Sequence, residues 1–196
     1  MSGKLFDRYG AILDEDVEVL EQVLDQLIHP GTVRVLEIGM HDGGTAKGIE
    51  AYLHAHGTRL EYWGIDPDDG KSRPRSIPEN ATIITGDSAE VFTQVPDGMH
   101  LVWVDGCHCF NHVVLDTLHY EGKVSNFGFM CFHDINPVGQ GSEHQYHGPV
   151  IPEFGLAVVS ALTAIHFPWG TWEFWMEKYP PETHNCGTRA YRKGHP

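Results

Sequence analysis

The sequence predicts a single α/β domain, in which a mainly parallel sheet carries helices on both of its faces. Three observations support this fold class. Strand-like and helix-like segments alternate along the chain, which is the pattern of strand–helix–strand units. The length of 196 residues suits one domain, and a hydrophobic content of 41% is enough for its core. Several apolar runs also end in an acidic residue, where an α/β sheet binds its ligand.

The first predicted element is a helix over residues 14–28, whose apolar residues recur at helical spacing and which Asp14 can cap. A proline and a glycine end it. The run over residues 33–39 is apolar through most of its length and predicts a buried strand. A turn with two glycines then leads into an amphipathic helix over residues 46–56.

The same alternation continues to the end of the chain. Apolar or alternating runs predict strands at residues 60–66, 81–87, 100–106, 127–134 and 171–179. Helical spacing predicts helices at residues 88–95, 112–120 and 153–165. A long loop follows residue 134, and its segment "GSEHQYHG", with His144 and His147, is either a lid over a substrate or a surface loop.

The chain shows no internal repeat and no second domain. We expect an N-terminal helical segment at residues 1–30, one domain at residues 31–180, and a loose tail at residues 181–196. An exposed N-terminal helix could serve a homo-oligomer.

The charge of the chain argues against anionic partners. Its formal net charge is −14, and its basic residues form no cluster longer than residues 71–75 or 189–193. Nucleic-acid grooves and anionic membrane surfaces need a positive field, so we expect neither partner. No run of eighteen apolar residues and no signal-peptide pattern is present, so we expect a cytoplasmic protein.

The four cysteines do not form the paired motifs of a structural zinc site, and reduced thiols are expected in a cytoplasmic protein. Cys107 and Cys109 could hold a soft metal. Two thiols one residue apart are more often inert neighbours, however, and the sequence alone favours that interpretation.

Five acidic residues stand at the ends of successive predicted strands. They are Glu37, Asp66, Asp87, Asp105 and Asp134. Ligands of open α/β sheets bind beyond the carboxyl ends of the strands, so these carboxylates are candidates for one binding site.

The turn after the first predicted strand reads "GMHDGGT", without the spacing of a dinucleotide-binding loop. Gly39 and either Gly43 or Gly44 let the backbone approach a ligand closely. Glu37 suits a ligand with a positive amino group, Asp66 can accept both hydroxyls of a ribose, and Asp87 beside Ser88 can bind an adenine amino group.

The segments "VLEIGMHDGGT", "YWGIDPDD" and "GDSAEVF" resemble the first three motifs of class I S-adenosylmethionine (SAM)-dependent methyltransferases. "VWVDGCHCFNHVVLDTL" and "GFMCFHDI" narrow the resemblance to O-methyltransferases related to cephalosporin hydroxylase-like and macrolide-sugar methyltransferases. The resemblance covers roughly residues 33 to 165. It implies a Rossmann-like sheet of seven strands.

The resemblance also implies the roles of individual residues. The expected cofactor-binding residues are Glu37, Gly39 and Gly43 for the methionine part of SAM, Asp66 for its ribose, Asp87 and Ser88 for its adenine, together with Thr45 and Asp105. Asp105 and Asp134, with His133 beside them, would hold a divalent metal such as Mg²⁺ or Mn²⁺. His108 would be the catalytic base, together with Asp105, and the methyl acceptor would be a hydroxyl of a sugar or natural product.

These roles agree with the chemistry of methyl transfer. The cofactor activates the methyl group, so the protein must orient the acceptor and remove its proton. His108 has an ordinary pKa of about 6.5, which suits a base at neutral pH. Adjacent strands lie about 4.8 Å apart, so Asp105 and Asp134 can share one cation. A nitrogen ligand at His133 would favour Mn²⁺, Fe²⁺ or Zn²⁺ over Mg²⁺.

Simpler alternatives stay open. Asp105 and His108 could merely tie a loop, and His133 could be a structural histidine. Cys107, Cys109, Asn111 and His112 depart from the common pattern of the family. A metal-dependent oxygenase, or a SAM-binding protein without activity, are therefore the rival functions.

Overall fold

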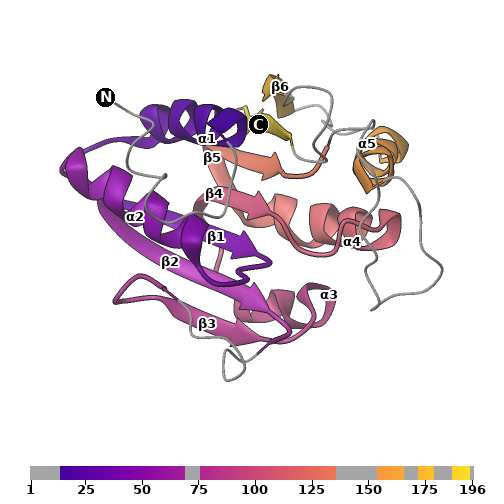
Figure 1. Ribbon diagram of the computed structural model, residues 1–196, viewed down its shortest axis with the longest axis horizontal. Helices are drawn as coiled ribbons and strands as arrows, with labels where there is room; N and C mark the ends of the chain where they lie inside the picture. Colours follow the sequence, from indigo (N-terminus) through magenta and orange to yellow (C-terminus); the bar gives the residue numbers. More distant parts are fainter. Residues whose placement is uncertain (1–13, 69–75, 136–153, 166–171, 179–186, 195–196) are drawn as a thin grey trace.

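The computed structural model describes residues 14–68, 76–135, 154–165, 172–178 and 187–194 (Figure 1). The strands are β1 (Thr32–Ile38), β2 (Arg59–Asp66), β3 (Thr82–Thr85), β4 (Met99–Val104), β5 (Val124–Phe132), β6 (Trp172–Lys178) and β7 (Thr188–Lys193). The helices are α1 (Asp14–Leu27), α2 (Gly44–Ala55), α3 (Ser88–Val91), α4 (Phe110–Tyr120) and α5 (Phe154–Ala164), with short 3-10 turns at Phe92–Gln94 and Glu121–Lys123. The loop with His144 and His147 lies outside the described residues.

The strands form one seven-stranded sheet in the order β3-β2-β1-β4-β5-β7-β6. Strands β1 to β5 pair in parallel, and only β7 runs antiparallel to its two neighbours. The predicted α/β fold, with a Rossmann-like, mainly parallel sheet in a single domain, is confirmed. The strand order reverses between β1 and β4, where open α/β sheets bind their ligands.

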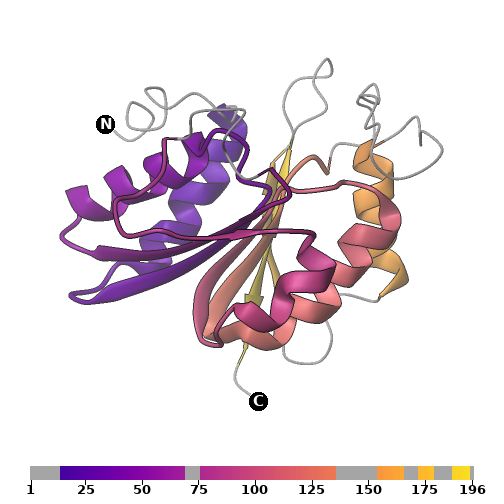
Figure 2. The same ribbon diagram turned by 90° about the horizontal axis from the view of Figure 1, so that it is seen from below.

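Helices cover both faces of the sheet, as Figure 2 shows. Apolar residues of α1 and α2, such as Leu20 and Leu53, pack with Val35 and Trp103 on one face. On the other face, α4 and α5 pack with residues such as Val102. Both cores are fully closed at their centres, where Leu20, Leu53, Val35, Trp103 and Val102 have no exposed surface. The central strands are therefore a rigid mount for the loops at their ends.

The predicted loose tail at residues 181–196 is wrong for Thr188–Lys193, because these residues form β7. Strand β7 inserts between β5 and β6, and Ala190 and Tyr191 are buried there. The sequence of β7 is short, and four of its residues are polar, so the alternation typical of a strand is not evident in it. Only the open edges of β5 and β6 give it pairing partners.

Helix α1 is not the exposed helix that the sequence suggested for an oligomer. Its residues Val17, Val19, Leu20, Val23 and Leu24 are buried in the core with β1 and β4. These residues of α1 therefore stabilise the core of the domain, and the homo-oligomer stays a prediction. Among the described residues, no helix has both the length and the apolar character needed to cross a bilayer.

Candidate functional site

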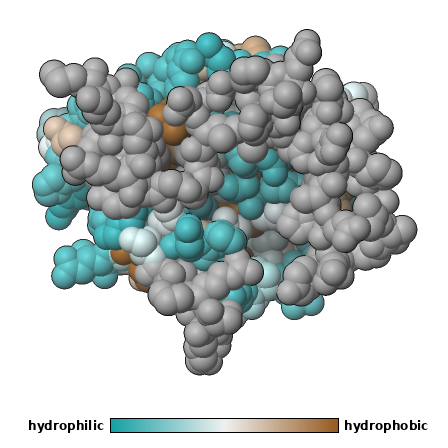
Figure 3. Space-filling view, viewed as in Figure 1, coloured by the Kyte–Doolittle hydropathy of each residue, from teal (hydrophilic) through white to brown (hydrophobic). Residues whose placement is uncertain are grey.

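The candidate site lies at the carboxyl ends of β1, β4 and β5, near the centre of the view in Figure 1. In the same view, hydrophilic residues gather near the middle of this face (Figure 3). Parallel pairing sets Val104 of β4 level with Phe132 of β5. Asp105 and His133, the next residue of each strand, therefore leave the sheet side by side.

The turn after β1 packs directly against the turn after β4. Gly39 has a φ of 88°, and a Cβ atom there would lie 2.2 Å from the carbonyl oxygen of Asp105. The backbone N–H of Asp105 donates to the carbonyl of Ile38 at 2.8 Å. Only glycine allows this approach, because any side chain at position 39 would collide with the other turn.

Glu37 is a buried carboxyl group on β1, with 1% of its surface exposed. The hydroxyl groups of Tyr62 and Thr45 donate hydrogen bonds to it. Burial raises the pKa of Glu37 to about 8, and the negative charges of Asp105 and Asp66 add to the rise, although the hydrogen bonds oppose it. A cation placed beside Glu37 would restore its ionised form.

Asp66 ends β2 and holds the two loops around it. Its Oδ2 accepts from the backbone N–H of His41 at 2.9 Å, and its Oδ1 accepts from that of Asp68 at 2.8 Å. Asp66 therefore stands between the turn after β1 and the loop after β2, and ribose binding by its carboxylate stays a prediction. Gly43, the other predicted glycine, has a φ of 81° and precedes α2.

Four predicted residues meet in one cluster. Ligand atoms of Asp105, His108, His133 and Asp134 all lie within 4.8 Å of one another. The Nε2 of His108 lies 3.4 Å from Asp105 Oδ1, and its Nδ1 lies 3.2 Å from Asp134 Oδ2. Both histidines are buried, whereas the two aspartates are partly exposed. Two imidazoles and two carboxylates suit a divalent cation.

The cluster changes the protonation of Asp105. Burial by itself would raise the pKa of this carboxyl group, but the positive charge and hydrogen bonds of His133 and His108 hold it well below its usual range. Asp105 is therefore a carboxylate at neutral pH, which is the form that binds metal or positions an imidazole. Asp134 has a φ of 55°, a left-handed conformation that aspartate tolerates better than most residues.

Asp16 of α1 is a part of this site that sequence reasoning missed. It is fully buried, its Oδ2 lies 3.1 Å from Nε2 of His133, and its Oδ1 accepts from Thr188 of β7 at 2.7 Å. The bond from Asp16 fixes the ring of His133 and leaves its Nδ1 facing Asp105 at 2.8 Å. The sequence does contain a signal for Asp16. It lies four residues before Leu20 on the same helix, so the two side chains share the buried face of α1.

The predicted adenine residues have local partners. Asp87 accepts from the backbone N–H of Ala89 at 2.9 Å as the cap of α3, and it lies 3.2 Å from Nε2 of His112. The hydroxyl of Ser88 donates to the buried Asp116 at 2.6 Å. The Ser88 side chain is thus engaged between α3 and α4, and adenine binding by Asp87 and Ser88 stays a prediction.

Comparisons with known proteins decide the family. A family model described as a methyltransferase domain matches residues 36–135, half of the chain and most of the site. The chain belongs to this methyltransferase family. The resemblance found in the sequence is confirmed, and so is the prediction of a methyltransferase. No curated protein matches the chain.

Solved methyltransferase structures share the fold. A candidate caffeoyl-CoA O-methyltransferase from Staphylococcus aureus matches with a TM-score of 0.69 and 12% identity, over 99% of this chain and 93% of that one. The MycE methyltransferase of the mycinamycin pathway, in complex with Mg, SAH and mycinamycin VI, matches with a TM-score of 0.68 and 19% identity, over 98% of this chain and 54% of that one. An SAH-bound methyltransferase from Podospora anserina matches with a TM-score of 0.65 and 11% identity, over 96% and 81% of the two chains.

Proposed function

We propose that this methyltransferase transfers a methyl group from SAM to a hydroxyl of a small molecule, assisted by a divalent metal and a histidine base. The observation that carries the proposal is the cluster of Asp105, His108, His133 and Asp134 beside the turn after β1. The residues proposed to bind SAM and the proposed base would thereby act at one edge of the sheet.

The turn after β1 and the end of β2 offer the groups that SAM needs. Glu37 would pair with the amino group of SAM, and Asp66 would accept the ribose hydroxyls. Thr45 donates to Glu37 and would keep that carboxylate oriented. Bound SAM supplies a methyl group already activated on sulfur. The SAH found with MycE and with the Podospora enzyme supports this choice of cofactor.

Asp105, His133 and Asp134 would hold the divalent metal. Their donor set fits, because the carboxylates supply hard oxygen ligands and Asp16 orients the imidazole of His133. The metal would lower the pKa of the acceptor hydroxyl. Nitrogen donors in the cluster favour Mn²⁺, Fe²⁺ or Zn²⁺, whereas the MycE structure contains Mg.

His108 would accept the proton of the acceptor hydroxyl. Asp105 and Asp134 lie on its two ring nitrogens at 3.4 and 3.2 Å, so either carboxylate can stabilise the imidazolium that forms. The acceptor class is inferred as a sugar or natural product, and the presence of mycinamycin VI in the MycE complex supports a small molecule.

The test combines cofactor binding with turnover of a panel of small hydroxyl compounds. SAM should bind with micromolar affinity, and a divalent metal should raise turnover. His108→Ala should keep SAM affinity within about twofold and lose at least about a hundredfold in turnover, the usual contribution of a general base. His54→Ala on α2 is the matched control, because His54 is exposed.

A metal-dependent oxygenase is the second candidate, since two histidines and a carboxylate, its usual ligands, do meet in the cluster. Iron-dependent consumption of oxygen without methylated product would favour it.

In the methyl-transfer test, turnover of His108→Ala at the wild-type rate would show that the base is another group.

A further inference from the structure

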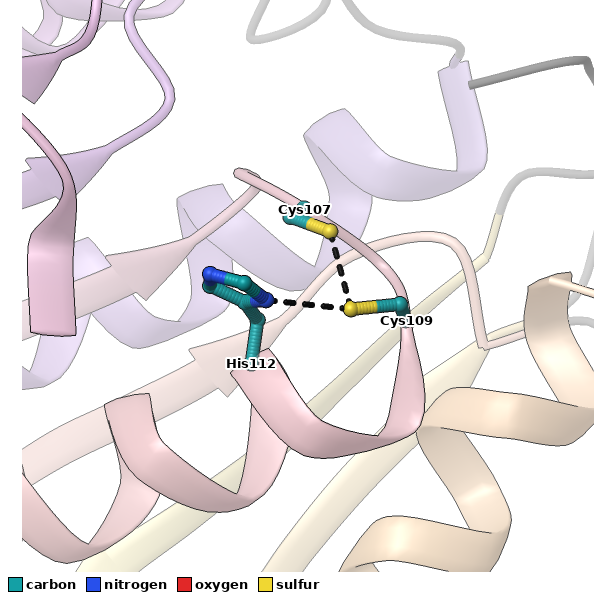
Figure 4. A group of neighbouring side chains, drawn as sticks. All are labelled: Cys107, Cys109 and His112. Carbon is teal, nitrogen blue, oxygen red and sulfur yellow. Dashed lines mark hydrogen bonds between the residues drawn. The ribbon is translucent and has the colours of Figure 1, made fainter. Parts of the chain in front are cut away.

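We propose that Cys107, Cys109 and His112 form a second metal site, which binds Zn²⁺ or a similar thiophilic cation. Figure 4 shows the three side chains converging from the turn after β4 and the first turn of α4. Ligand atoms of all three lie within 4.8 Å of one another. This site shares no ligand with the cluster of Asp105, His108, His133 and Asp134.

The local fold brings the three groups together. The Sγ atoms of Cys107 and Cys109 lie 3.0 Å apart, and Cys109 Sγ lies 3.1 Å from His112 Nδ1. Cys109 is the cap residue of α4, and His112 follows it by three residues, so the helix sets one above the other. The spacing of the two cysteines alone did not favour a metal, but the imidazole supplies the third ligand.

Asp87 prepares His112 for this role. Its carboxylate lies 3.2 Å from Nε2 of His112, the ring nitrogen that does not face the sulfurs. With its proton on Nε2, toward Asp87, the imidazole of His112 would present the lone pair of Nδ1 to a metal. Carboxylate–histidine pairs of this kind are the usual outer partners of zinc ligands.

The geometry needs little change to accept the ion. Zinc bonds sulfur at about 2.3 Å and nitrogen at about 2.0 Å with tetrahedral angles, which separates two sulfur ligands by about 3.8 Å. The sulfurs would move apart by less than about 1 Å. Cys107, Cys109 and His112 are partly exposed, so an ion can reach them, and three protein ligands leave the fourth position for water.

The donor atoms select the metal. Two thiolates and one imidazole suit Zn²⁺, Cd²⁺ or Co²⁺ and bind Mg²⁺ poorly. An ion held here would fix His112 and hence Asp87. If Asp87 contacts adenine, occupancy would also change SAM affinity. That consequence rests on the proposed function, whereas metal binding does not.

The test is a titration of the reduced full-length protein with Cd²⁺, read by the ultraviolet charge-transfer band that only sulfur ligands produce. We expect one equivalent per chain, two sulfur neighbours by X-ray absorption, displacement by Zn²⁺, and no effect of excess Mg²⁺. The double variant Cys107→Ser/Cys109→Ser should lose the band. Asp87→Asn, which leaves all three ligands in place, should weaken Cd²⁺ binding by about 10- to 100-fold.

The controls are Cys131→Ala, which removes a buried thiol on β5, and His54→Ala, which removes an exposed imidazole. Both should bind Cd²⁺ like the wild type. A wild-type protein without the band, or a double variant that keeps it, would overturn the site. The Cd²⁺ titration needs neither SAM nor turnover. A negative result would therefore disprove the second metal site without disproving the proposed methyl transfer.

Discussion

At the scale of single residues, Glu37 is a buried carboxyl group of the candidate site whose proton is held more tightly than usual. It is buried among Tyr62, Thr45 and two further acidic groups, and its pKa is raised to about 8. At neutral pH the ligand-free protein therefore holds Glu37 mostly protonated. Pairing with the amino group of SAM would favour the carboxylate, so binding would release a proton.

We predict that SAM binding at about pH 7 releases a substantial fraction of one proton from Glu37. Calorimetric titrations in two buffers with different ionisation enthalpies measure this release. Glu37→Gln should abolish the release and weaken SAM binding by roughly 10- to 100-fold, the worth of a charge-assisted hydrogen bond. A buffer-independent enthalpy for the wild type would contradict the pairing.

Gly39 offers a second prediction at this scale. Gly39→Ala places a Cβ atom 2.2 Å from the carbonyl oxygen of Asp105, whereas at Gly57, which also has a positive φ, no atom lies within 4 Å. Gly57→Ala should cost about 1–2 kcal/mol in left-handed strain alone. Gly39→Ala should cost clearly more, as measured by urea unfolding. Equal costs would show that the two turns are not in contact.

At the scale of elements, helix α1 and strand β7 are joined to the cluster of Asp105, His108, His133 and Asp134 by the hydrogen bonds of Asp16 with His133 and Thr188. The two elements lie at opposite ends of the chain. Their contact means that the N-terminal helix supports the site as well as the core.

We predict that Asp16→Asn weakens binding of Mn²⁺ by about 10- to 100-fold, because the orientation of the His133 ring is lost. Glu18→Gln is the matched control on the same helix, since the Glu18 side chain is half exposed at 50%. Metal affinity is measured by calorimetry or by the magnetic resonance of bound Mn²⁺. If both variants bind Mn²⁺ equally well, His133 is not a ligand.

Much of each element could be predicted from local patterns. The helix over residues 14–28 ends one residue earlier in the structure, and the strand over residues 60–66 starts one residue earlier. Asp105, His108, His133 and Asp134 were all candidates, because each follows a strongly apolar run. Asp16 was missed, since its partners His133 and Thr188 are more than a hundred residues away. Strand β7 was missed because its short sequence is largely polar, and its pairing with β5 and β6 depends on the tertiary structure.

At the scale of the whole molecule, buried carboxyl groups set how stability depends on pH. Burial raises the pKa of Glu37 from its ordinary value of 4.5 to about 8. Burial likewise raises the pKa of Asp116 from 3.8 to about 7, against the opposing hydrogen bond of Ser88. Both groups hold their protons more tightly in the folded state than in the unfolded state. Their contribution to stability therefore falls as pH rises from the unfolded to the folded pKa.

We predict that the ligand-free protein loses stability between about pH 4.5 and about pH 8, measured as the free energy of unfolding in urea. The double variant Glu37→Gln/Asp116→Asn should lose clearly less over the same range. Asp105 acts in the opposite sense, because its lowered pKa gives stability that disappears only in acid. A wild type as stable at the higher pH would contradict the raised pKa values.

The sequence by itself determined the alternation of strands and helices, the acidic residues near the ends of five strands and the resemblance to methyltransferases. These features depend on local periodicity and on the residues next to each strand. Only the tertiary structure decided which side chains meet. Strand order and register bring Asp105 beside His133, α1 supplies Asp16, and the first turn of α4 turns His112 toward two sulfurs. Such contacts depend on packing between distant segments and on side-chain directions, which no local pattern specifies.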